Sequence, residues 1–477
     1  MKYITISKKD YFKAKSKKLD VVPSSNISIQ KDFHKDILLK TQKLLNQIKT
    51  KDILSRYNLS EELTYSLHYN LKFFFHQKLF EYELTKRSER EIWKSNKEKR
   101  KINNICDYKR SSIFKFFIKI FHNIVDFNSL FFFKVLLFFR CLLKKGDIIV
   151  SYPNNGLQSA LHNLGIEKRN ILYLVPNKDQ FILIRVIKFI LGGQYLPFYP
   201  RKLDNRPLKD IDENIISDEK IISNKKLNKM ISNWIIQRER DYLISKTIIF
   251  FLQPKVFISQ QSLDKNAVMA LAFKKNEISS LLISHGSHIV NSDLLAMHEW
   301  KYHSRTMLYG PFSFSVLQSP AAKKFYQHQN LKIKSIQSKP LIIWNKNNIL
   351  INNDRKKLYG ISAEKKILLY ASTPKFEGSL RPYIYETEDE YINNIISLIK
   401  LISKRKDLHL AIRHRETKEL SKKDLLQCLP KSDNYYIYVE GNFESYLASS
   451  DLLISYSSTT IEQALFAFKK VLLWDSL

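Results

Sequence analysis

Cysteine is nearly absent from this sequence. Three occur among 477 residues, at positions 106, 141 and 428, and no two stand at the C-x-x-C spacing of a zinc site. Neither a zinc site nor a disulfide framework is therefore indicated, which favours a reducing compartment, the cytoplasm. Glycine is also scarce, with 10 residues, while lysine, isoleucine and asparagine are abundant. That bias is typical of an AT-rich genome.

Long uninterrupted apolar runs are absent as well. The most apolar segment, residues 112–145, is interrupted by Lys115, Lys119, Asp126, Lys134 and Arg140. It therefore lacks the ~18–20 apolar residues of a membrane-spanning helix, and the N-terminus lacks the apolar core of a signal peptide. The segment predicts one or two amphipathic helices with basic edges. These would pack on the protein's own core or rest on a membrane surface.

Acidic residues are scarce relative to basic ones. Asp and Glu number 46 against 79 Lys and Arg, which gives a formal net charge of +33. Such an excess suggests an anionic neighbour, such as nucleic acid, a membrane surface or a phosphate-bearing substrate, although the AT-rich composition is an alternative explanation. No motif that reads RNA or DNA accompanies the charge, so no specific nucleic-acid partner is expected.

Strand-like and helix-like segments alternate along most of the chain. Residues 1–145 are predicted to form a helical N-terminal arm. Apolar strands then alternate with helices over residues 146–340 and again over 341–477, with residues 332–344 as the hinge between the two series. This alternation predicts an α/β protein of two Rossmann-like domains, with parallel sheets that face each other across a cleft. Ligands of such sheets bind beyond the carboxyl ends of the strands.

A turn rich in hydroxyl groups follows one of the last strands. In "DLLISYSSTTIEQAL", the strand LLIS leads to Ser457, Ser458 and Thr459, and the first turn of the next helix carries Glu462. Hydroxyl and backbone N–H groups at such a turn can bind a diphosphate, and the carboxylate can accept hydrogen bonds from a ribose. The alternative is an ordinary helix N-cap whose glutamate completes a capping box.

Polar residues also follow three other strands. "LLISHG" ends in His285 and Gly286, where the histidine can act as a general base and the glycine permits close backbone approach. "ILLYAST" ends in Thr373, and "LHLAIRH" ends in Arg413 and His414, which are suited to a phosphate. Four polar strand ends in this order favour one shared anionic site over four separate structural caps.

This ordered set of motifs resembles the CDP-glycerol glycerophosphotransferase group and related bacterial surface-polysaccharide glycosyltransferases, which are GT-B proteins. The resemblance covers residues 250–477, roughly half the chain. It implies that His285 is the catalytic base, that His414 and the hydroxyls of residues 457–459 bind the donor's phosphates, and that Glu462 binds its ribose.

Two departures from that group bear on the reaction. Arg415 stands where the group usually has proline, and no basic residue closely follows the His-Gly pair. They favour a glycosyltransferase that moves a sugar from a nucleotide-activated donor and needs no metal or other cofactor. The acceptor would be a capsule, lipopolysaccharide or other cell-surface polysaccharide, or a lipid-linked acceptor. Such an enzyme would contact the anionic inner membrane peripherally. The alternatives are a CDP-glycerol-type glycerophosphotransferase, a sugar-nucleotide 2-epimerase, and a non-catalytic protein that binds polyanions or membranes.

Three smaller features complete the interpretation. "DID" at Asp210–Asp212 lies in a charged stretch rather than after a strand, so no metal is expected there. "YETEDE", residues 385–390, is expected to begin a helix, with its acidic side chains at the favourable end of the helix dipole. The chain stops at "VLLWDSL", directly after a strand, where GT-B proteins usually continue, so a truncated C-terminal domain is expected. The sequence does not indicate an oligomeric state.

Overall fold

The computed structural model describes most of the chain. The described residues are 3–5, 8–23, 27–50, 54–55, 59, 63, 66–68, 70–72, 74–75, 92–93, 129–143, 147–200, 224–284, 290, 292–337, 341, 359–361, 364–371, 373, 375, 386–417, 420–456 and 458–474. Three residues predicted to form the site, His285, Gly286 and Ser457, lie outside them, as does Asp210–Asp212.

Among these residues, seven parallel strands form the N-terminal sheet, in the order β10-β9-β8-β7-β4-β5-β6. The first strand of the series, β4, therefore lies beside the fourth, β7, and the chain runs outward in opposite directions from this pair. This is the strand order of a Rossmann domain with an additional strand at one edge. The strands are β4 Ile148–Val150, β5 Ile171–Pro176, β6 Tyr195–Leu196, β7 Val256–Ser259, β8 Ser280–Ile283, β9 Phe314–Leu317 and β10 Lys334–Gln337.

Both faces of the N-terminal sheet are covered by helices. Successive residues of a strand point to opposite faces: Ile149 packs with α8 and α9, whereas Val150 packs against α6. The central strands are therefore mostly apolar, as is typical of a parallel sheet. The helices are α5 Leu130–Leu143, α6 Asn155–Asn163, α7 Ile182–Ile190, α8 Asn224–Leu252, α9 Asp264–Lys275, α10 Leu294–Leu308 and α11 Pro320–His328. No helix in the described part of the chain is both long and apolar enough to cross a membrane.

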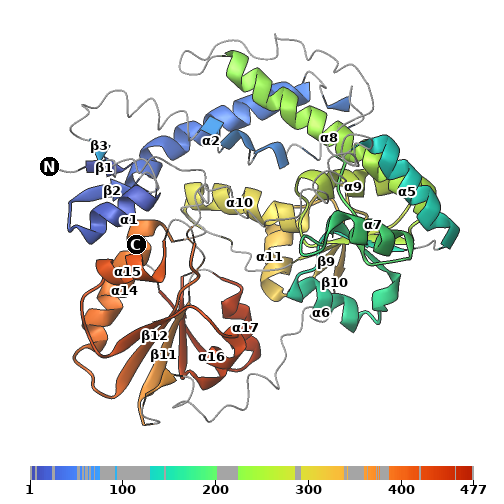
Figure 1. The fold of residues 1–477 in the computed structure, drawn as a ribbon. Helices are drawn as coiled ribbons and strands as arrows, with labels where there is room; N and C mark the ends of the chain where they lie inside the picture. The colour runs from blue at the N-terminus through green and yellow to red at the C-terminus, as the bar shows by residue number, and fades with distance from the viewer. Residues whose placement is uncertain are drawn as a thin grey trace, which may run out of the picture.

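The C-terminal sheet repeats this arrangement on a smaller scale (Figure 1). Its parallel strands follow the order β13-β12-β11-β14-β15, so the first strand, β11, again lies beside the fourth, β14. Tyr370 packs toward α14 and α15, and its neighbours Leu369 and Ala371 pack toward α16 and α17. The elements are β11 Lys366–Ala371, α14 Glu388–Ile402, β12 Leu408–Arg413, α15 Lys422–Cys428, β13 Tyr435–Tyr438, α16 Phe443–Ser449, β14 Leu452–Ser455, α17 Thr460–Phe466 and β15 Lys470–Leu473.

The N-terminal arm is shared between the two domains. A small parallel sheet, β1 (Tyr3–Thr5) with β2 (Val21–Pro23) and β3 (Ile92–Trp93), accompanies helix α1 (Lys8–Ser16). Helix α1 packs on α14 and α15 of the C-terminal domain, whereas α2 (Ile27–Thr50) adds its apolar side chains to the core of the N-terminal domain. Figure 1 shows α1 directly above α15, next to the chain's C-terminus.

The predicted fold class, an α/β protein of two Rossmann-like domains with an N-terminal helical arm, is confirmed. Two local predictions were wrong. Part of the predicted hinge, Lys334–Gln337, is the edge strand β10, and Ile92–Trp93 is a strand rather than part of a helix. All four residues of β10 are exposed, so the strand lacks the apolar pattern by which it could have been recognised.

Candidate functional site

The strand order of the C-terminal domain determines where a ligand of this sheet binds. Ligands of open parallel sheets bind beyond the carboxyl ends of the strands, at the point where the strand order reverses. Here that point lies between β11 and β14. Thr373 follows β11, Ser458 follows β14, and the Ser455 hydroxyl donates a hydrogen bond to the carbonyl of Ala371 (2.8 Å). The fold therefore brings two of the predicted polar strand ends to one edge.

The turn between β14 and α17 is not a capping box. Thr459 is the N-cap residue of α17, but its side chain makes no capping hydrogen bond, and Ser458 Oγ instead accepts from the backbone N–H of Thr460 (3.3 Å). The same domain has a true capping box at α14, where Thr387 and Glu390 bond to each other's backbone N–H groups. Thr459 is an exposed residue. Glu462 stands half-exposed in the first turn of α17.

Arg413, predicted to bind phosphate, bonds to backbone carbonyls of its own domain. Its guanidinium donates to the carbonyl oxygen of Tyr438 (3.3 Å), the last residue of β13, and to those of Val439 and Gly441 (3.0 Å) in the loop between β13 and α16. It also lies over the ring of Tyr446, 5.5 Å from its centroid. Through these contacts Arg413 holds that loop against the end of β12. Phosphate binding by this residue stays a prediction.

His414 also has internal partners. Its side chain is buried, with Nδ1 2.9 Å from the hydroxyl of Tyr391 and Nε2 3.2 Å from the carbonyl oxygen of Leu420. Because a carbonyl can only accept, Nε2 carries the proton and Nδ1 accepts from the tyrosine. Burial lowers the pKa of His414, which keeps the ring neutral. A phosphate contact by His414 would have to replace one of these bonds, and it also stays a prediction.

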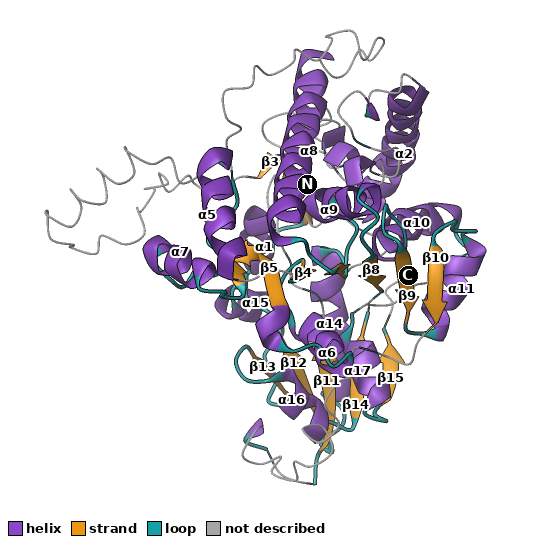
Figure 2. Ribbon diagram, turned by 90° about the vertical axis from the view of Figure 1, so that its right-hand side faces the viewer, coloured by secondary structure: helices purple, strands orange, loops and turns teal. Residues whose placement is uncertain are grey.

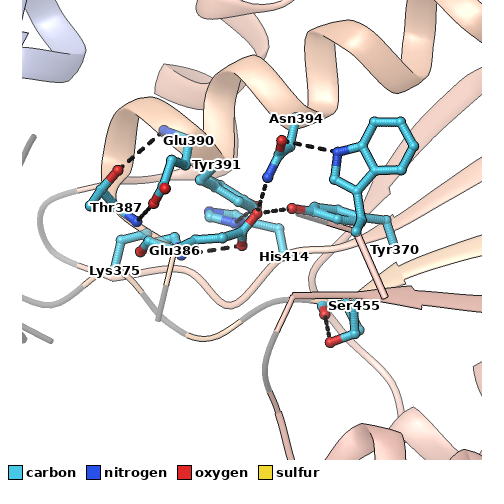
Figure 3. A network of polar contacts seen from close by, with 11 residues as sticks. Tyr370, Lys375, Glu386, Thr387, Glu390, Tyr391, Asn394, His414 and Ser455 are labelled. Atoms are coloured by element: carbon cyan, nitrogen blue, oxygen red, sulfur yellow. Dashed lines mark hydrogen bonds and ion pairs between the residues drawn. The ribbon is translucent and has the colours of Figure 1, made fainter. Parts of the chain in front are cut away.

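Next to His414 lies a buried network that the sequence analysis did not identify (Figure 3). The Lys375 ammonium donates to the backbone carbonyl of Glu386 (3.1 Å) and lies 3.5 Å from its carboxylate, and both side chains are almost fully buried. The same ammonium lies over the ring of Tyr391, 4.7 Å from the centroid. The network therefore joins the segment after β11 to the start of α14 and, through Tyr391, to His414.

The Glu386 carboxylate is the centre of this network. It accepts from the hydroxyl of Tyr370 and from the side-chain amide of Asn394 (2.8 Å), whose oxygen accepts from the indole N–H of Trp474 (2.9 Å). Burial and the adjacent carboxylate raise the pKa of Tyr370, so its proton remains in the bond. Lys375 and Glu386 lie in loops, where residues have no periodicity, so no pattern in the sequence indicated that these groups would meet.

The N-terminal sheet has its own point of reversal, between β4 and β7. Asn154, after β4, donates through its side-chain amide to the side-chain oxygen of Gln260, after β7 (2.6 Å). The predicted base His285 directly follows Ser284 at the end of the neighbouring strand β8, but the placement of its side chain and of Gly286 is outside the described residues. The structure therefore assigns no contact to either.

Within the described ranges, no group of three or more His, Cys, Asp or Glu side chains is arranged to bind a metal ion. The acidic segment at residues 385–390 has the predicted role, because Glu388, Asp389 and Glu390 occupy the first turn of α14. Cys141 and Cys428 are free thiols.

Comparison with known proteins gives structural likeness alone. No protein-family model matches the sequence, and no curated protein matches it. A UDP-GlcNAc 2-epimerase from Neisseria meningitidis, bound to UDP-GlcNAc, is similar with a TM-score of 0.44 and 12% identity over 69% of this chain and 83% of its own. The S. aureus MnaA–UDP structure has a TM-score of 0.41 at 12% identity, over 70% of this chain and 79% of its own.

A sucrose-phosphate synthase from Thermosynechococcus elongatus is similar at a TM-score of 0.39 and 9% identity, covering 68% of this chain and 80% of its own. Likenesses of this strength assign no residue and no activity to the chain.

Proposed function

We propose that this protein is a glycosyltransferase that binds a nucleotide-activated sugar at the carboxyl edge of the C-terminal sheet. The acceptor would be a growing cell-surface polysaccharide or a lipid-linked glycan. The observation that carries the proposal is the turn after β14, which lies at the reversal of strand order and contains an exposed threonine, Thr459, whose side chain makes no capping hydrogen bond. The motif resemblance set out above supports the same assignment.

In this proposal each residue has a defined task. The hydroxyls of Ser457, Ser458 and Thr459, together with Thr373 across the strand pair, donate to the diphosphate, and the Glu462 carboxylate accepts from the ribose hydroxyls. An acceptor hydroxyl oxygen bonds to the anomeric carbon while the bond from that carbon to the phosphate oxygen breaks, and the leaving diphosphate takes the electron pair. His285 takes the acceptor's proton.

The buried network around Glu386 supports this site indirectly. It fixes the start of α14 against the ends of β11 and β12 through groups that are almost fully buried. Sites built on rigidly held strand ends lose less conformational entropy when a ligand binds. We therefore assign Lys375 and Glu386 to positioning the edge of the sheet rather than to contact with the donor.

A thermal-shift screen of CMP, CDP, UDP, GDP and dTDP tests the donor site directly. One nucleotide at 100 times its Kd should stabilise the protein by about 2.7 kcal/mol, a shift of a few degrees. Thr459→Ala and Glu462→Ala should each weaken that binding by ~1–3 kcal/mol, because each removes a hydrogen bond to the ligand. Selectivity for CMP or CDP would instead favour the glycerophosphotransferase alternative.

Ser421→Ala is the matched control. Ser421 caps α15 in the same domain with a complete capping box, so its loss should lower the melting temperature but leave the nucleotide-induced shift intact. The proposal fails if no nucleotide stabilises the protein, or if the control loses the shift as fully as Thr459→Ala. Conversion of a nucleotide sugar in the absence of any acceptor would identify an epimerase instead.

A further inference from the structure

Two neighbouring helices of the N-terminal domain expose an unusual amount of apolar surface. Helices α5 and α7 are in contact, and Figures 1 and 2 both show them together at one edge of that domain. Phe131 and Leu191 are 67% and 71% exposed. The other exposed apolar side chains of this surface, here called the α5–α7 face, are Phe138, Phe139, Leu142, Leu143, Phe181, Leu183, Ile184 and Ile187.

Each of these two helices also buries other apolar side chains in the domain core. Leu130, Phe133 and Leu137 of α5 and Phe189 of α7 are buried in the core, so the exposed side chains exceed what folding requires. Single exposed apolar residues are common on soluble proteins, but ten of them on and beside two contacting helices mark a surface that binds something.

The α5–α7 face is rigidly built. Arg140, fully buried at the inner side of α5, donates to the carbonyl oxygens of Phe189 (2.7 Å) and Gly193 (2.8 Å) at the end of α7. It also forms an ion pair with buried Asp147, just before β4 (2.9 Å). A Cβ at Gly193 would meet the Lys188 carbonyl oxygen at 2.6 Å, so this close approach of the chain requires glycine.

The charged residues of these two helices are all basic. Helices α5 and α7 contain no acidic residue, and exposed Lys134 and Lys188 stand among the apolar side chains, with Arg185 half-buried beside them. The chain as a whole carries a net charge of +33. An apolar surface with basic residues is complementary to the interface of an anionic membrane, where lysine stems lie along the acyl chains and their ammonium groups reach the headgroups.

We propose that the α5–α7 face docks the protein on an anionic lipid bilayer, with the exposed side chains of both helices inserted at the level of the headgroups. The two helices then lie in the plane of the interface and neither spans it. This docking does not depend on a nucleotide, so it stands or fails separately from the proposed donor site. It would place a glycosyltransferase beside lipid-linked acceptors.

Vesicle co-sedimentation of the full chain tests the proposal. Wild-type protein should bind vesicles of phosphatidylglycerol and phosphatidylcholine, and should bind phosphatidylcholine alone at least about tenfold more weakly. Leu183→Glu/Ile187→Glu should reduce partitioning to the anionic vesicles about tenfold or more, because two carboxylates would enter the interface. Lys134→Glu/Lys188→Glu should remove the preference for anionic lipid.

Matched controls carry the same changes on other surfaces. Leu164→Glu/Leu401→Glu alters two exposed leucines outside both helices, and Lys404→Glu/Lys406→Glu reverses two exposed lysines of the C-terminal domain. Both should bind vesicles as wild type does, and all variants should keep the wild-type circular dichroism spectrum.

Absence of wild-type binding, or equal losses in variants and controls, would overturn the proposal. So would a wild-type dimer in light scattering that Leu183→Glu/Ile187→Glu dissociates, since the face would then join two copies.

Discussion

At the scale of single residues, the C-terminal sheet carries an unpaired histidine in its interior. His409 is buried in β12, and neither of its ring nitrogens has a hydrogen-bond partner in the described part of the chain. Burial, with a smaller contribution from Lys365, lowers the pKa of His409 to about 4. A buried polar group of this kind costs free energy that an apolar side chain would not.

His409 therefore makes stability depend on pH. In the unfolded chain the imidazole has a pKa near 6.5, so between pH 6.5 and 4 the unfolded state binds a proton that the folded state does not. The free energy of unfolding is therefore highest, as far as this histidine affects it, above pH 6.5. It falls by about 2 kcal/mol between pH 7 and 5. Urea denaturation at both pH values should show that loss in wild type and a smaller loss in His409→Leu, which should also be more stable at pH 7 by about 1 kcal/mol.

Exposed His328 on α11 provides the comparison for this prediction. His328→Leu makes the same substitution at a histidine that folding leaves exposed, and it controls for the change from His to Leu itself. Buried His414 contributes a pH dependence of the same sign, since burial lowers its pKa too, so His409→Leu flattens the profile without abolishing it. Equal pH dependence in wild type and His409→Leu would show that the buried imidazole keeps its proton or has a partner.

At the scale of secondary-structure elements, one arginine joins α5, α7 and β4. Replacing Arg140 by Met would leave the Asp147 carboxylate buried without its cation, and removing one partner of a buried pair costs ~3–5 kcal/mol. The double variant Arg140→Met/Asp147→Asn should recover part of that loss, because the remaining side chain is neutral. Chemical denaturation measures both, and a double variant less stable than the single would show that the ion pair is not the reason for the loss.

The same scale shows what could be predicted from the sequence. The strands β11, β12 and β14 were recognisable because each is an apolar run followed by polar residues, and their shared carboxyl edge follows from parallel pairing. The hydrogen-bond partners of Arg413 could not be predicted, because an arginine at a strand end can equally bind a phosphate or hold a neighbouring loop. The Lys375–Glu386 pair depends on where two loops meet, which local sequence patterns do not determine.

At the scale of the whole molecule, helix α1 near the N-terminus packs on the C-terminal domain. Tyr11 and Phe12 of α1 are buried in the core that α14 and α15 share with the C-terminal sheet. The Tyr11 hydroxyl bonds to the Asp389 carboxylate, and Lys15 lies 3.3 Å from it. The chain then crosses to the N-terminal domain through α2 and returns after β10. The C-terminal domain is therefore discontinuous in sequence. It depends on contacts between distant segments, which no local sequence pattern predicts.

This arrangement predicts that a change near the N-terminus loosens the C-terminal domain. Phe12→Ala empties a fully buried site and should cost ~3–5 kcal/mol, with faster amide hydrogen exchange in α14 and α15 and unchanged exchange in α9. Phe325→Ala, at an equally buried site on α11 of the N-terminal domain, should give the opposite pattern. If Phe12→Ala left α14 and α15 as protected as in wild type, α1 would be a surface attachment; if it loosened α9 equally, the two domains would unfold as one unit.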